Sequence, residues 1–419
     1  MDTLTRRKFL IASGVVAGGA LAAGATAYSL ADILATADRD DRDPDARTLV
    51  LITLYGGNDG LNTVIPYADA AYHDARPELA YDAGQVLRLD DALGLNPALT
   101  GMHRLFGEKR LAIVRGVGYP KADRSHFRSM DIWQTAQPDR PGATGWLGRW
   151  LDTVGGDPRL AVSFEPVLPP LLAGRTTAGA AVPAGRLSLP GGVGTQSLAG
   201  FGAPQAGEPA LQARAAACFA DLIEIDKMVT AVNDVADEAA ETDSDDAVPQ
   251  ATGTGGGRAP LDVQLDMVAR CVEAGVATRA FSVSLGGFDT HADEKQLQEQ
   301  LLGIVDKAVG VFVDRMAKSA AGRKVVVAVY SEFGRRARAN ASDGTDHGTA
   351  SNVFLLGAGV RGGLYGEQPS LTDLDNGDLK FTTDFRDVYA TLLDRVLEAE
   401  PEGLLDGWSG RLTGPLSAD

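Results

Sequence analysis

The chain has 419 residues and a formal net charge of −17. This charge excludes nucleic acid as a partner, because binding of phosphates needs a basic surface that no segment supplies. Its two cysteines, Cys218 and Cys271, can form one disulfide but are too few for a disulfide framework and lack the neighbours of a zinc cluster.

The N-terminal segment carries the pattern of an export signal. Arg6 and Arg7 precede Phe9, and a weakly apolar run rich in glycine and alanine follows, with small-residue sites at 25–27 and 35–37. This resembles a twin-arginine signal. A membrane anchor is the alternative, which the glycines disfavour. We therefore expect residues 1–37 to be a signal peptide read by the twin-arginine export machinery.

The export signal sets an expectation for where the protein resides. After such a leader, the mature chain resides in the periplasm, in the cell envelope or outside the cell. No second apolar segment of spanning length follows the leader, so the mature chain is expected to contain no membrane span. Residues 38–47 are charged and form a linker, and the folded region is expected to cover residues 48–419.

Short apolar runs alternate with helical patterns through the folded region. Residues starting at Gln296 and at Asp384 have apolar side chains every three or four positions, which is typical of helices. The alternation predicts an α/β fold with a mainly parallel central sheet and helices on both faces. The predicted buried strands are TLVLITL from Thr48, LAIVRGV from Leu111, LAVSFE from Leu160, AFSVSL from Ala280, KVVVAVY from Lys324 and VFLLG from Val353.

An irregular insert of about residues 168–260 interrupts this alternation. Its first part, to residue 209, is rich in proline, glycine and alanine and is expected to be ordered but irregular. Its last part, from residue 241, is expected to be a mobile loop, and a helix containing Cys218 lies between the two. Because predicted strands lie on both sides of it, we interpret the insert as part of a single domain.

Polar clusters follow the predicted strands, where α/β folds place their sites. Asp59 follows the first strand in the segment GGNDGLN, either as a metal ligand or as a helix cap. Ser125 and His126 begin a predicted helix, where a hydroxyl group meets free N–H groups and suits nucleophilic catalysis. Either of the two can be the functional group, or Ser125 only caps the helix and His126 is structural. Asp289 and His291 follow the strand AFSVSL, and their i, i+2 spacing lets one ion take both side chains.

The last cluster lies in the segment SEFGRRARANASDGTDHG. Glu332 directly follows a strand, and Asp346 and His347 come after a loop. Of the five histidines in the chain, three lie in these polar clusters. Carboxylates and imidazoles without thiolates suit Zn²⁺, Mn²⁺, Mg²⁺ or Ca²⁺. Arg335 and Arg336 can hold an anionic group, or they can pair with nearby acids.

The set of motifs resembles the domain of unknown function (DUF) 1501 family, exported bacterial proteins grouped with the alkaline phosphatase and sulfatase superfamily. The motifs that carry the resemblance, from Leu51 to Leu393, are GGNDGLN, RSHFRSMDIWQTA, GGFDTH, SEFGRRARAN with DGTDHG, and TDFRDVYATLLD. The resemblance implies an alkaline-phosphatase-like sandwich that binds one or two divalent metal ions. It implies that Asp59 is a metal ligand and Ser125 the nucleophile, with Asp289 and His291 at one ion.

The resemblance further implies that Asp346 and His347 bind the other ion. No histidine follows His347, so either Asp384 or Asp387 replaces the usual late ligand or one ion is absent. We therefore predict a metal-dependent hydrolase of phosphate or sulfate esters with an anionic ester as substrate. The alternative is a catalytically silent protein that binds a partner or assembles in the envelope.

Overall fold

The computed structural model describes most of the chain, with a gap in the insert. Outside the described residues lie Arg6 and Arg7 of the leader and Cys218 of the insert. In the parts of the chain that the structure describes, no helix is both long and apolar enough to cross a membrane. The described residues are 26–28, 30–37, 43, 45–165, 168–182 and 259–416.

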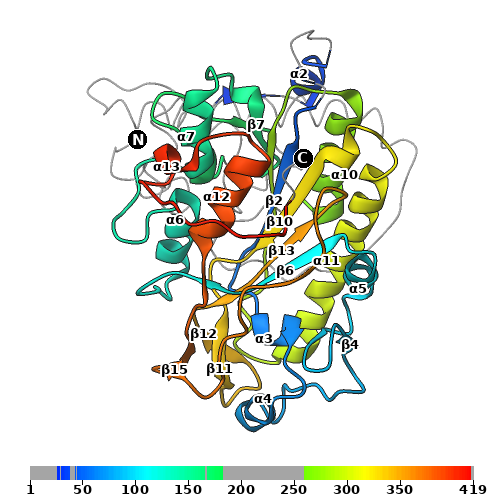
Figure 1. Ribbon diagram of the computed structural model, residues 1–419, viewed down its shortest axis with the longest axis vertical. Coiled ribbons are helices and arrows are strands. Elements are labelled where there is room, and N and C mark those ends of the chain that lie inside the picture. Colours follow the sequence, from blue (N-terminus) through cyan, green and yellow to red (C-terminus); the bar gives the residue numbers. More distant parts are fainter. Residues whose placement is uncertain are drawn as a thin grey trace, which may run out of the picture.

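A ten-stranded sheet runs through the centre of the molecule (Figure 1). Neighbouring strands are parallel except β13, which is antiparallel to both β10 and β6. The six strands predicted from the sequence all lie in this sheet, so the predicted α/β class with a mainly parallel sheet is confirmed. The strand order is β1 (Thr26–Ala27), β8 (Ala180–Ala181), β7 (Ala161–Ser163), β9 (Ala280–Leu285), β2 (Thr48–Leu54), β10 (Val325–Tyr330), β13 (Ser351–Leu356), β6 (Leu111–Gly118) and β14 (Gly363–Tyr365), with β17 (Thr383–Asp384) also pairing with β6.

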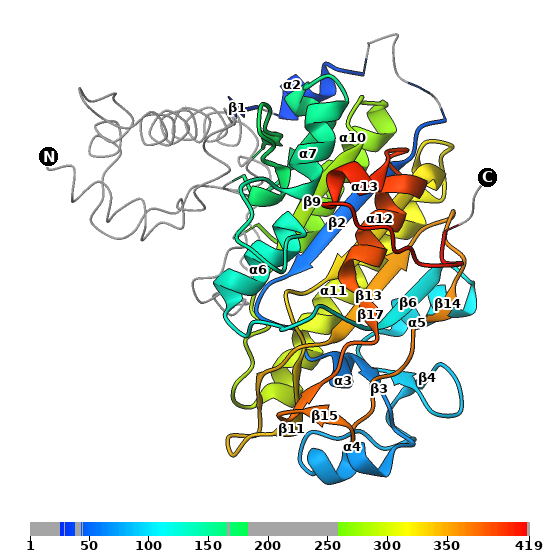
Figure 2. The ribbon, with the colours of Figure 1, turned by 60° about the vertical axis from the view of Figure 1, so that its left-hand side comes forward.

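Helices cover both faces of the sheet, and Figure 2 shows the two layers from a second direction. Side chains alternate across a strand, so Val50 and Ile52 of β2 point into one core while Leu49 and Leu51 point into the other. Packed on the first face are α2 (Leu30–Leu34), α5 (Thr100–Gly107), α10 (Leu261–Ala274) and α11 (Glu294–Met316). Packed on the second are α6 (His126–Thr135), α7 (Trp146–Thr153), α12 (Phe385–Arg395) and α13 (Pro401–Leu404).

Two segments at the edges of the predicted domain pack more closely than expected. The segment 26–37 was assigned to the leader, yet β1 pairs with β8 and Ile33 is fully buried in the core. The first part of the insert was expected to be irregular, yet it supplies β8, which pairs with β7. Since β7 in turn pairs with β9, strands from both sides of residues 183–258 build the same sheet.

A smaller layer of short elements covers the end of the sheet where β2, β9 and β10 finish (Figure 1). The chain between β10 and β13 forms a hairpin of β11 and β12, and this hairpin packs near α3 and α4. This arrangement brings the hairpin over the carboxyl ends of three parallel strands. The elements are α3 (Gly60–Thr63), β3 (Val64–Ile65), α4 (Ala70–Ala75), β4 (Leu87–Arg88), β5 (Gly94–Leu95), β11 (Arg335–Ala339), β12 (Thr345–His347), β15 (Leu374–Asp375) and β16 (Asp378–Leu379).

Candidate metal centre

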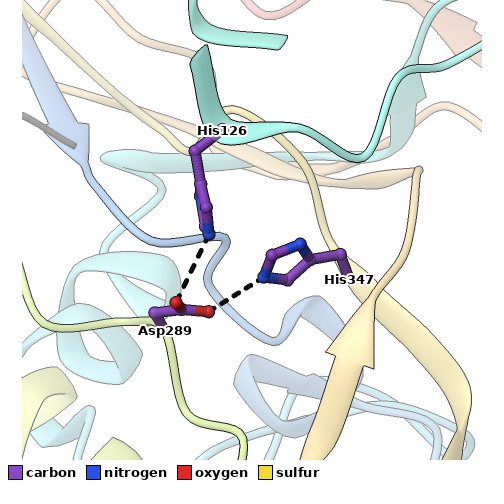
Figure 3. A group of neighbouring side chains, drawn as sticks. All are labelled: His126, Asp289 and His347. Carbon is purple, nitrogen blue, oxygen red and sulfur yellow. Dashed lines mark hydrogen bonds and ion pairs between the residues drawn. The ribbon is translucent and has the colours of Figure 1, made fainter. Parts of the chain in front are cut away.

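Three side chains from distant segments converge at the carboxyl end of the sheet. His126 comes from the first turn of α6, Asp289 from the loop after β9, and His347 from the end of β12 (Figure 3). One possible ligand atom from each lies within 4.8 Å of the others, and among the described residues this group can hold a metal ion. The contacts are 3.4 Å from His126 Nε2 to Asp289 Oδ2 and 3.0 Å from His347 Nε2 to Asp289 Oδ1.

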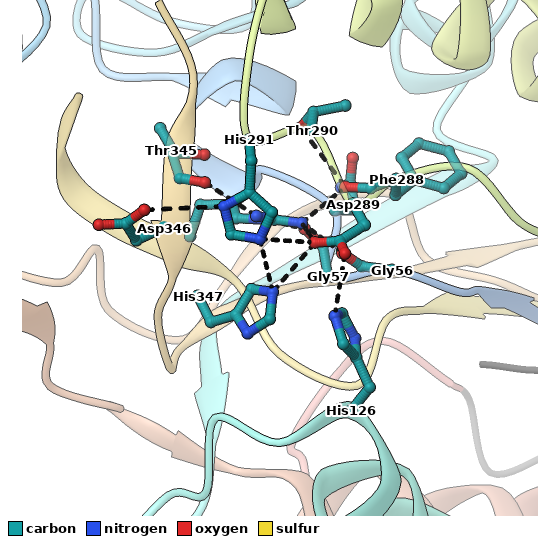
Figure 4. Close-up of polar contacts among 12 residues, drawn as sticks. Gly56, Gly57, His126, Phe288, Asp289, Thr290, His291, Thr345, Asp346 and His347 are labelled. Carbon is teal, nitrogen blue, oxygen red and sulfur yellow. Dashed lines mark hydrogen bonds and ion pairs between the residues drawn. The ribbon is translucent and has the colours of Figure 1, made fainter. Parts of the chain in front are cut away.

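His291 extends this group from the same loop as Asp289. Its Nε2 atom lies 2.9 Å from His347 Nε2 and 3.0 Å from Asp289 Oδ1 (Figure 4). The exposed fraction of the side chain rises from 12% for His126 through 23% for His347 to 45% for His291. The group is therefore closed on the His126 side and open to solvent on the His291 side.

The other ring nitrogen of each histidine faces an acceptor. His347 Nδ1 lies 2.9 Å from the backbone oxygen of Arg124, which can only accept a hydrogen bond. His126 Nδ1 lies 2.9 Å from Glu332 Oε1, and His291 Nδ1 lies 3.6 Å from Asp346 Oδ1. A proton on Nδ1 leaves the lone pair of a neutral imidazole on Nε2, and this is the arrangement of histidine ligands in metal sites.

These contacts fit a metal ion better than a set of protein hydrogen bonds. If the proton of a neutral ring lies on Nδ1, the Nε2 atoms of His291 and His347 face each other and the Asp289 carboxylate with no proton between them. His126 Nε2 is buried and makes no hydrogen bond. A divalent cation at this point would satisfy all four groups, because imidazole and carboxylate groups both ligate such ions through lone pairs.

Burial and neighbouring charges shift the pKa values of Asp289, His126 and His291. Burial raises the pKa of Asp289, but the contacts with His126, His347 and Arg335 outweigh it and hold the pKa well below its usual range. Burial lowers the pKa of His126, but the carboxylates of Asp289 and Glu332 overcome this and raise it to about 9. Burial and the charge of Arg335 lower the pKa of His291, which favours the neutral, ligating ring.

Glu332, predicted as a metal ligand, lies beside the cluster and contacts the ring of His126. Its side chain is fully buried, and Oε1 accepts hydrogen bonds from the Gly56 N–H and from His126 Nδ1, each over 2.9 Å. Its second oxygen accepts a hydrogen bond from Ser331 Oγ over 3.0 Å. Glu332 therefore fixes the His126 ring, and the sequence alone could not reveal this because the strand end only places the carboxylate near the site.

Asp346, which was also predicted as a metal ligand, lies beside His291 and not at the centre of the cluster. Its side chain is 57% exposed, and its nearest site contact is with the Nδ1 atom of His291, on the side away from Asp289. Figure 4 shows the carboxylate on the outer side of the His291 ring. Of the Asp-His pair, His347 faces the cluster, because side chains of successive residues in strand β12 point to opposite faces.

Asp59 has a structural role and does not join the cluster. Its carboxylate is buried, forms an ion pair with Arg76, and caps α3 by accepting a hydrogen bond from the Leu61 N–H. Arg76 also donates to the backbone oxygens of Arg336 and Ala337 in strand β11. The ion pair therefore anchors the hairpin that carries His347. Nothing in the sequence near Asp59 marks Arg76, which lies 17 residues away.

Arg335 and Arg336, which the sequence suggested as anion-binding residues, bind groups of the protein itself. Arg335 is buried and donates to the backbone oxygens of Gly56, Gly57, Phe288 and Thr345 and to Asp289. Arg336 contacts Asp378 Oδ1 over 3.3 Å and the backbone oxygen of Asn376. The expected alternative of pairing with acids thus holds for both, and Arg335 gathers the loops of the site.

Ser125 remains free at the start of α6. It is exposed, and its side chain forms no capping hydrogen bond with the helix. It directly precedes the ligand candidate His126. The two late acids, by contrast, lie elsewhere: Asp384 caps α12 and pairs with Arg386, and Asp387 accepts a hydrogen bond from Trp408. Among the described residues, one group, that of His126, Asp289 and His347, could hold a metal ion.

Comparisons with known proteins place the chain in a family of unknown function. A family model described as "Protein of unknown function (DUF1501)" matches residues 115–414, well over half of the chain. Among curated proteins, no sequence matches this chain.

Three similar solved structures have low sequence identity to this chain. A protein in the alkaline phosphatase superfamily from Vibrio parahaemolyticus is 10% identical, covers 88% of this chain and 74% of its own, and has a TM-score of 0.40. A lipoteichoic acid synthase from Listeria monocytogenes is 10% identical, covers 92% of this chain and 78% of its own, and has a TM-score of 0.35. A phosphonate monoester hydrolase from Silicibacter pomeroyi is 11% identical, covers 89% of this chain and 78% of its own, and has a TM-score of 0.40. At these identities, no activity or substrate transfers to this chain.

Proposed function

We propose that this chain, which belongs to the DUF1501 family, is a metal-dependent hydrolase of phosphate or sulfate esters. One observation carries the proposal: the Nε2 atoms of three histidines converge on the carboxylate of Asp289, and the Nδ1 atom of each ring faces an acceptor. Neutral imidazoles fixed in this way are ligands for a divalent cation.

The ligand atoms favour a transition metal ion. A set rich in nitrogen with one carboxylate suits Zn²⁺ or a similar ion, whereas Mg²⁺ and Ca²⁺ prefer oxygen ligands. His126, Asp289 and His347 would provide three protein ligands. Catalytic zinc sites commonly use three and leave a further position open. The more exposed His291 would then close the site or give way to substrate.

The residues around the cluster suit the hydrolysis of an anionic ester. A bound ion would supply a Lewis acid that polarises the ester. Ser125, adjacent to His126 and free of capping contacts, is the proposed nucleophile. The first-turn N–H groups of α6, which the Ser125 side chain leaves free, would stabilise anionic oxygens of the substrate. Glu332 would keep the His126 ring in place.

A second candidate is a binding or assembly protein of the cell envelope that has the metal centre but no turnover. The specific observation in its favour concerns Arg335 and Arg336. Of the two roles that the sequence allows them, holding an anion or pairing with acids, both arginines take the second, and they bind backbone oxygens and carboxylates of the protein. The metal centre would then have a structural role, as closed four-ligand zinc sites do.

Export by the twin-arginine route is part of the proposal. Arg6, Arg7 and Phe9 support it, and a periplasmic, envelope or extracellular location follows from it. The twin-arginine route transports folded proteins, so the metal centre would assemble before export. Replacing both arginines by lysine should retain the protein in the cytoplasm, which cell fractionation would show. Unchanged export of this variant would rule out the route.

Metal content and ester turnover together test the proposed hydrolase. Protein purified without added metal should retain about one zinc or similar ion per chain, and it should hydrolyse members of a panel of phosphate and sulfate esters. Ser125→Ala should abolish turnover and keep the metal. The exposed Ser409 provides the matched control, since Ser409→Ala should change neither quantity.

The outcomes separate the two candidates. A metal ion without turnover of any ester favours the binding protein, and retained activity in Ser125→Ala excludes this serine as the nucleophile. Protein that takes up no metal, even when zinc is added, contradicts both candidates, because both depend on the cluster of His126, Asp289 and His347.

A further inference from the structure

A buried carboxyl group that none of the proposed catalytic steps uses lies beside the metal centre. Glu294 is the first residue of α11, and its exposed fraction is 0%. One of its oxygens, Oε2, accepts a hydrogen bond from Thr345 Oγ1. The other, Oε1, is buried and accepts no hydrogen bond from any N–H or hydroxyl group. An oxygen left in this state costs free energy unless a proton or cation reaches it.

Asp59 is the carboxyl group that neighbours Glu294. The interaction between the two groups raises the pKa of Glu294 and lowers that of Asp59. Two ionised carboxylates repel each other and only accept hydrogen bonds, so a proton on one of them turns the repulsion into a possible bridge. Arg76 forms an ion pair with Asp59, which makes Asp59 the ionised partner and Glu294 the protonated one. With one arginine, one carboxylate and one neutral acid, this buried cluster has no net charge.

The position of Glu294 connects the two segments that supply the metal ligands. Thr345, its hydrogen-bond partner, begins β12 and stands two residues before His347. Glu294 itself stands three residues after His291, and its N–H group donates to the backbone oxygen of Asp343 in the hairpin over 2.9 Å. On its other side, Asp59 and Arg76 anchor the same hairpin.

Further contacts show that the two segments pack closely at this point. The Thr345 N–H donates to the Thr290 backbone oxygen over 3.3 Å, and Asn340 Nδ2 donates to the His291 backbone oxygen over 3.0 Å. A Cβ atom on Gly344 would lie 2.3 Å from the His291 carbonyl carbon. Within this contact, the carboxyl group of Glu294 is the side chain that bridges from α11 to both Asp59 and Thr345.

We propose that Glu294 is a positioning residue for the metal centre: by bridging Asp59 and Thr345, it locks the hairpin that carries His347 against the loop that carries Asp289 and His291. The inference rests on the proposed metal centre and adds a residue that acts through others. Its proton makes the bridge possible, because an ionised Glu294 would face the Asp59 carboxylate with no proton between them. Burial and the charge of Asp59 raise the pKa of Glu294, and this supports the protonated state at neutral pH.

Zinc affinity of the full chain, measured by competition with a chelating dye, tests this role without reference to turnover. Glu294→Ala should lower the affinity by about tenfold or more, as loss of a supporting group commonly does. Glu294→Gln should stay close to wild type, because its amide group can donate to Asp59 while its oxygen accepts from Thr345. Glu299→Ala is the matched control on the same helix, since Glu299 contacts Tyr81.

The pH dependence distinguishes positioning from a general loss of stability. The charged and titratable groups facing Glu294 are Asp59, Arg76 and Tyr72. Burial raises the pKa of Asp59, but Arg76 and the neighbouring Glu294 lower it overall, so Asp59 stays ionised above acidic pH. Raising the pH then removes the proton of Glu294 and weakens the bridge. Zinc affinity of the wild type relative to Glu294→Gln should therefore fall as the pH rises.

The inference is overturned by wild-type zinc affinity in Glu294→Ala or by equal losses of affinity in Glu294→Gln and Glu294→Ala. It is also overturned if the ratio of wild-type to Glu294→Gln affinity does not change with pH. If Glu294→Ala does not fold, Thr345→Val removes the same bridge, and unchanged affinity in that variant likewise contradicts the role. A wild type that binds no zinc at all would instead contradict the proposed metal centre.

Discussion

Two aspartates follow neighbouring parallel strands and have opposite surroundings. Asp59 follows β2, is fully buried and pairs with the fixed cation of Arg76. Asp289 follows β9, has a side chain that is 27% exposed, and faces three imidazole rings in addition to Arg335. Both lie where α/β folds place ligands. The difference shows that position at a strand end does not by itself define a carboxylate's role, because its partners decide whether it pairs with a fixed cation or joins the candidate metal centre.

Removing Asp59 should have the largest effect on stability. Asp59→Ala leaves the buried Arg76 without its anion, which should lower the free energy of unfolding by about 3–5 kcal/mol. Chemical denaturation measures this loss. The double variant Asp59→Leu with Arg76→Met should recover much of it, since two apolar side chains leave no buried charge. A loss of metal at undiminished stability would show instead that Asp59 is a ligand.

Removing Asp289 should affect the metal more than the fold. Asp289→Ala should weaken zinc binding on the order of 100-fold, because it removes the carboxylate that the three imidazoles share. Its effect on the stability of the metal-free protein should be smaller than that of Asp59→Ala, because Arg335 keeps four backbone acceptors. Equilibrium dialysis and chemical denaturation measure the two quantities. Asp346→Ala is the control. It should lower zinc affinity by about tenfold or less, because Asp346 contacts only the outer side of His291.

The pH dependence of the metal-free protein should give the smallest effect. The pKa of His126 is raised to about 9 in the folded protein, above its value of about 6.5 in an unfolded chain. The protonated ring therefore stabilises the fold fully below about pH 6.5, and this contribution is lost as the pH rises through about 9. Allowing for solvent near the ring, the loss should be about 1–2 kcal/mol.

Metal binding should show the opposite trend over the same range. Zinc must displace the His126 proton, so its affinity should increase as the pH rises toward 9. His126→Gln should remove both trends, and thermal denaturation and dye competition can follow them. A stability profile that is the same in the wild type and His126→Gln would show that the ring carries no raised pKa.

The sequence predicted the sheet well because the strands carry their own signal. The runs at β2 and β10 are mostly apolar and are buried along their whole length, as parallel strands in the centre of a sheet are. The segment 168–182 gave no such signal, because the two-residue strand β8 is too short to form a pattern. Its pairing depends on the neighbouring strand β7, which sequence periodicity does not report.

The site was predicted less completely, and the reason is again the range of the contacts. Asp289 and His347 stand out as polar residues after strands, so their presence at the site could be expected. The roles of Asp59 and Glu332 depend on Arg76 and on the ring of His126, which are far away in the sequence. The backbone oxygen that orients His347 has no side-chain signature. Residue type therefore located candidates, and tertiary contacts assigned their roles.

The buried guanidinium group of Arg335 has a consequence for how the protein folds. It joins backbone oxygens at the ends of β2 and β9 to one in the hairpin, across as many as 279 residues of chain. Closing contacts over such separations is slow, because the chain between them must lose entropy before the contact forms. The ligands should therefore meet late, after the sheet has assembled. A nascent chain would then not capture its ion until folding is almost complete.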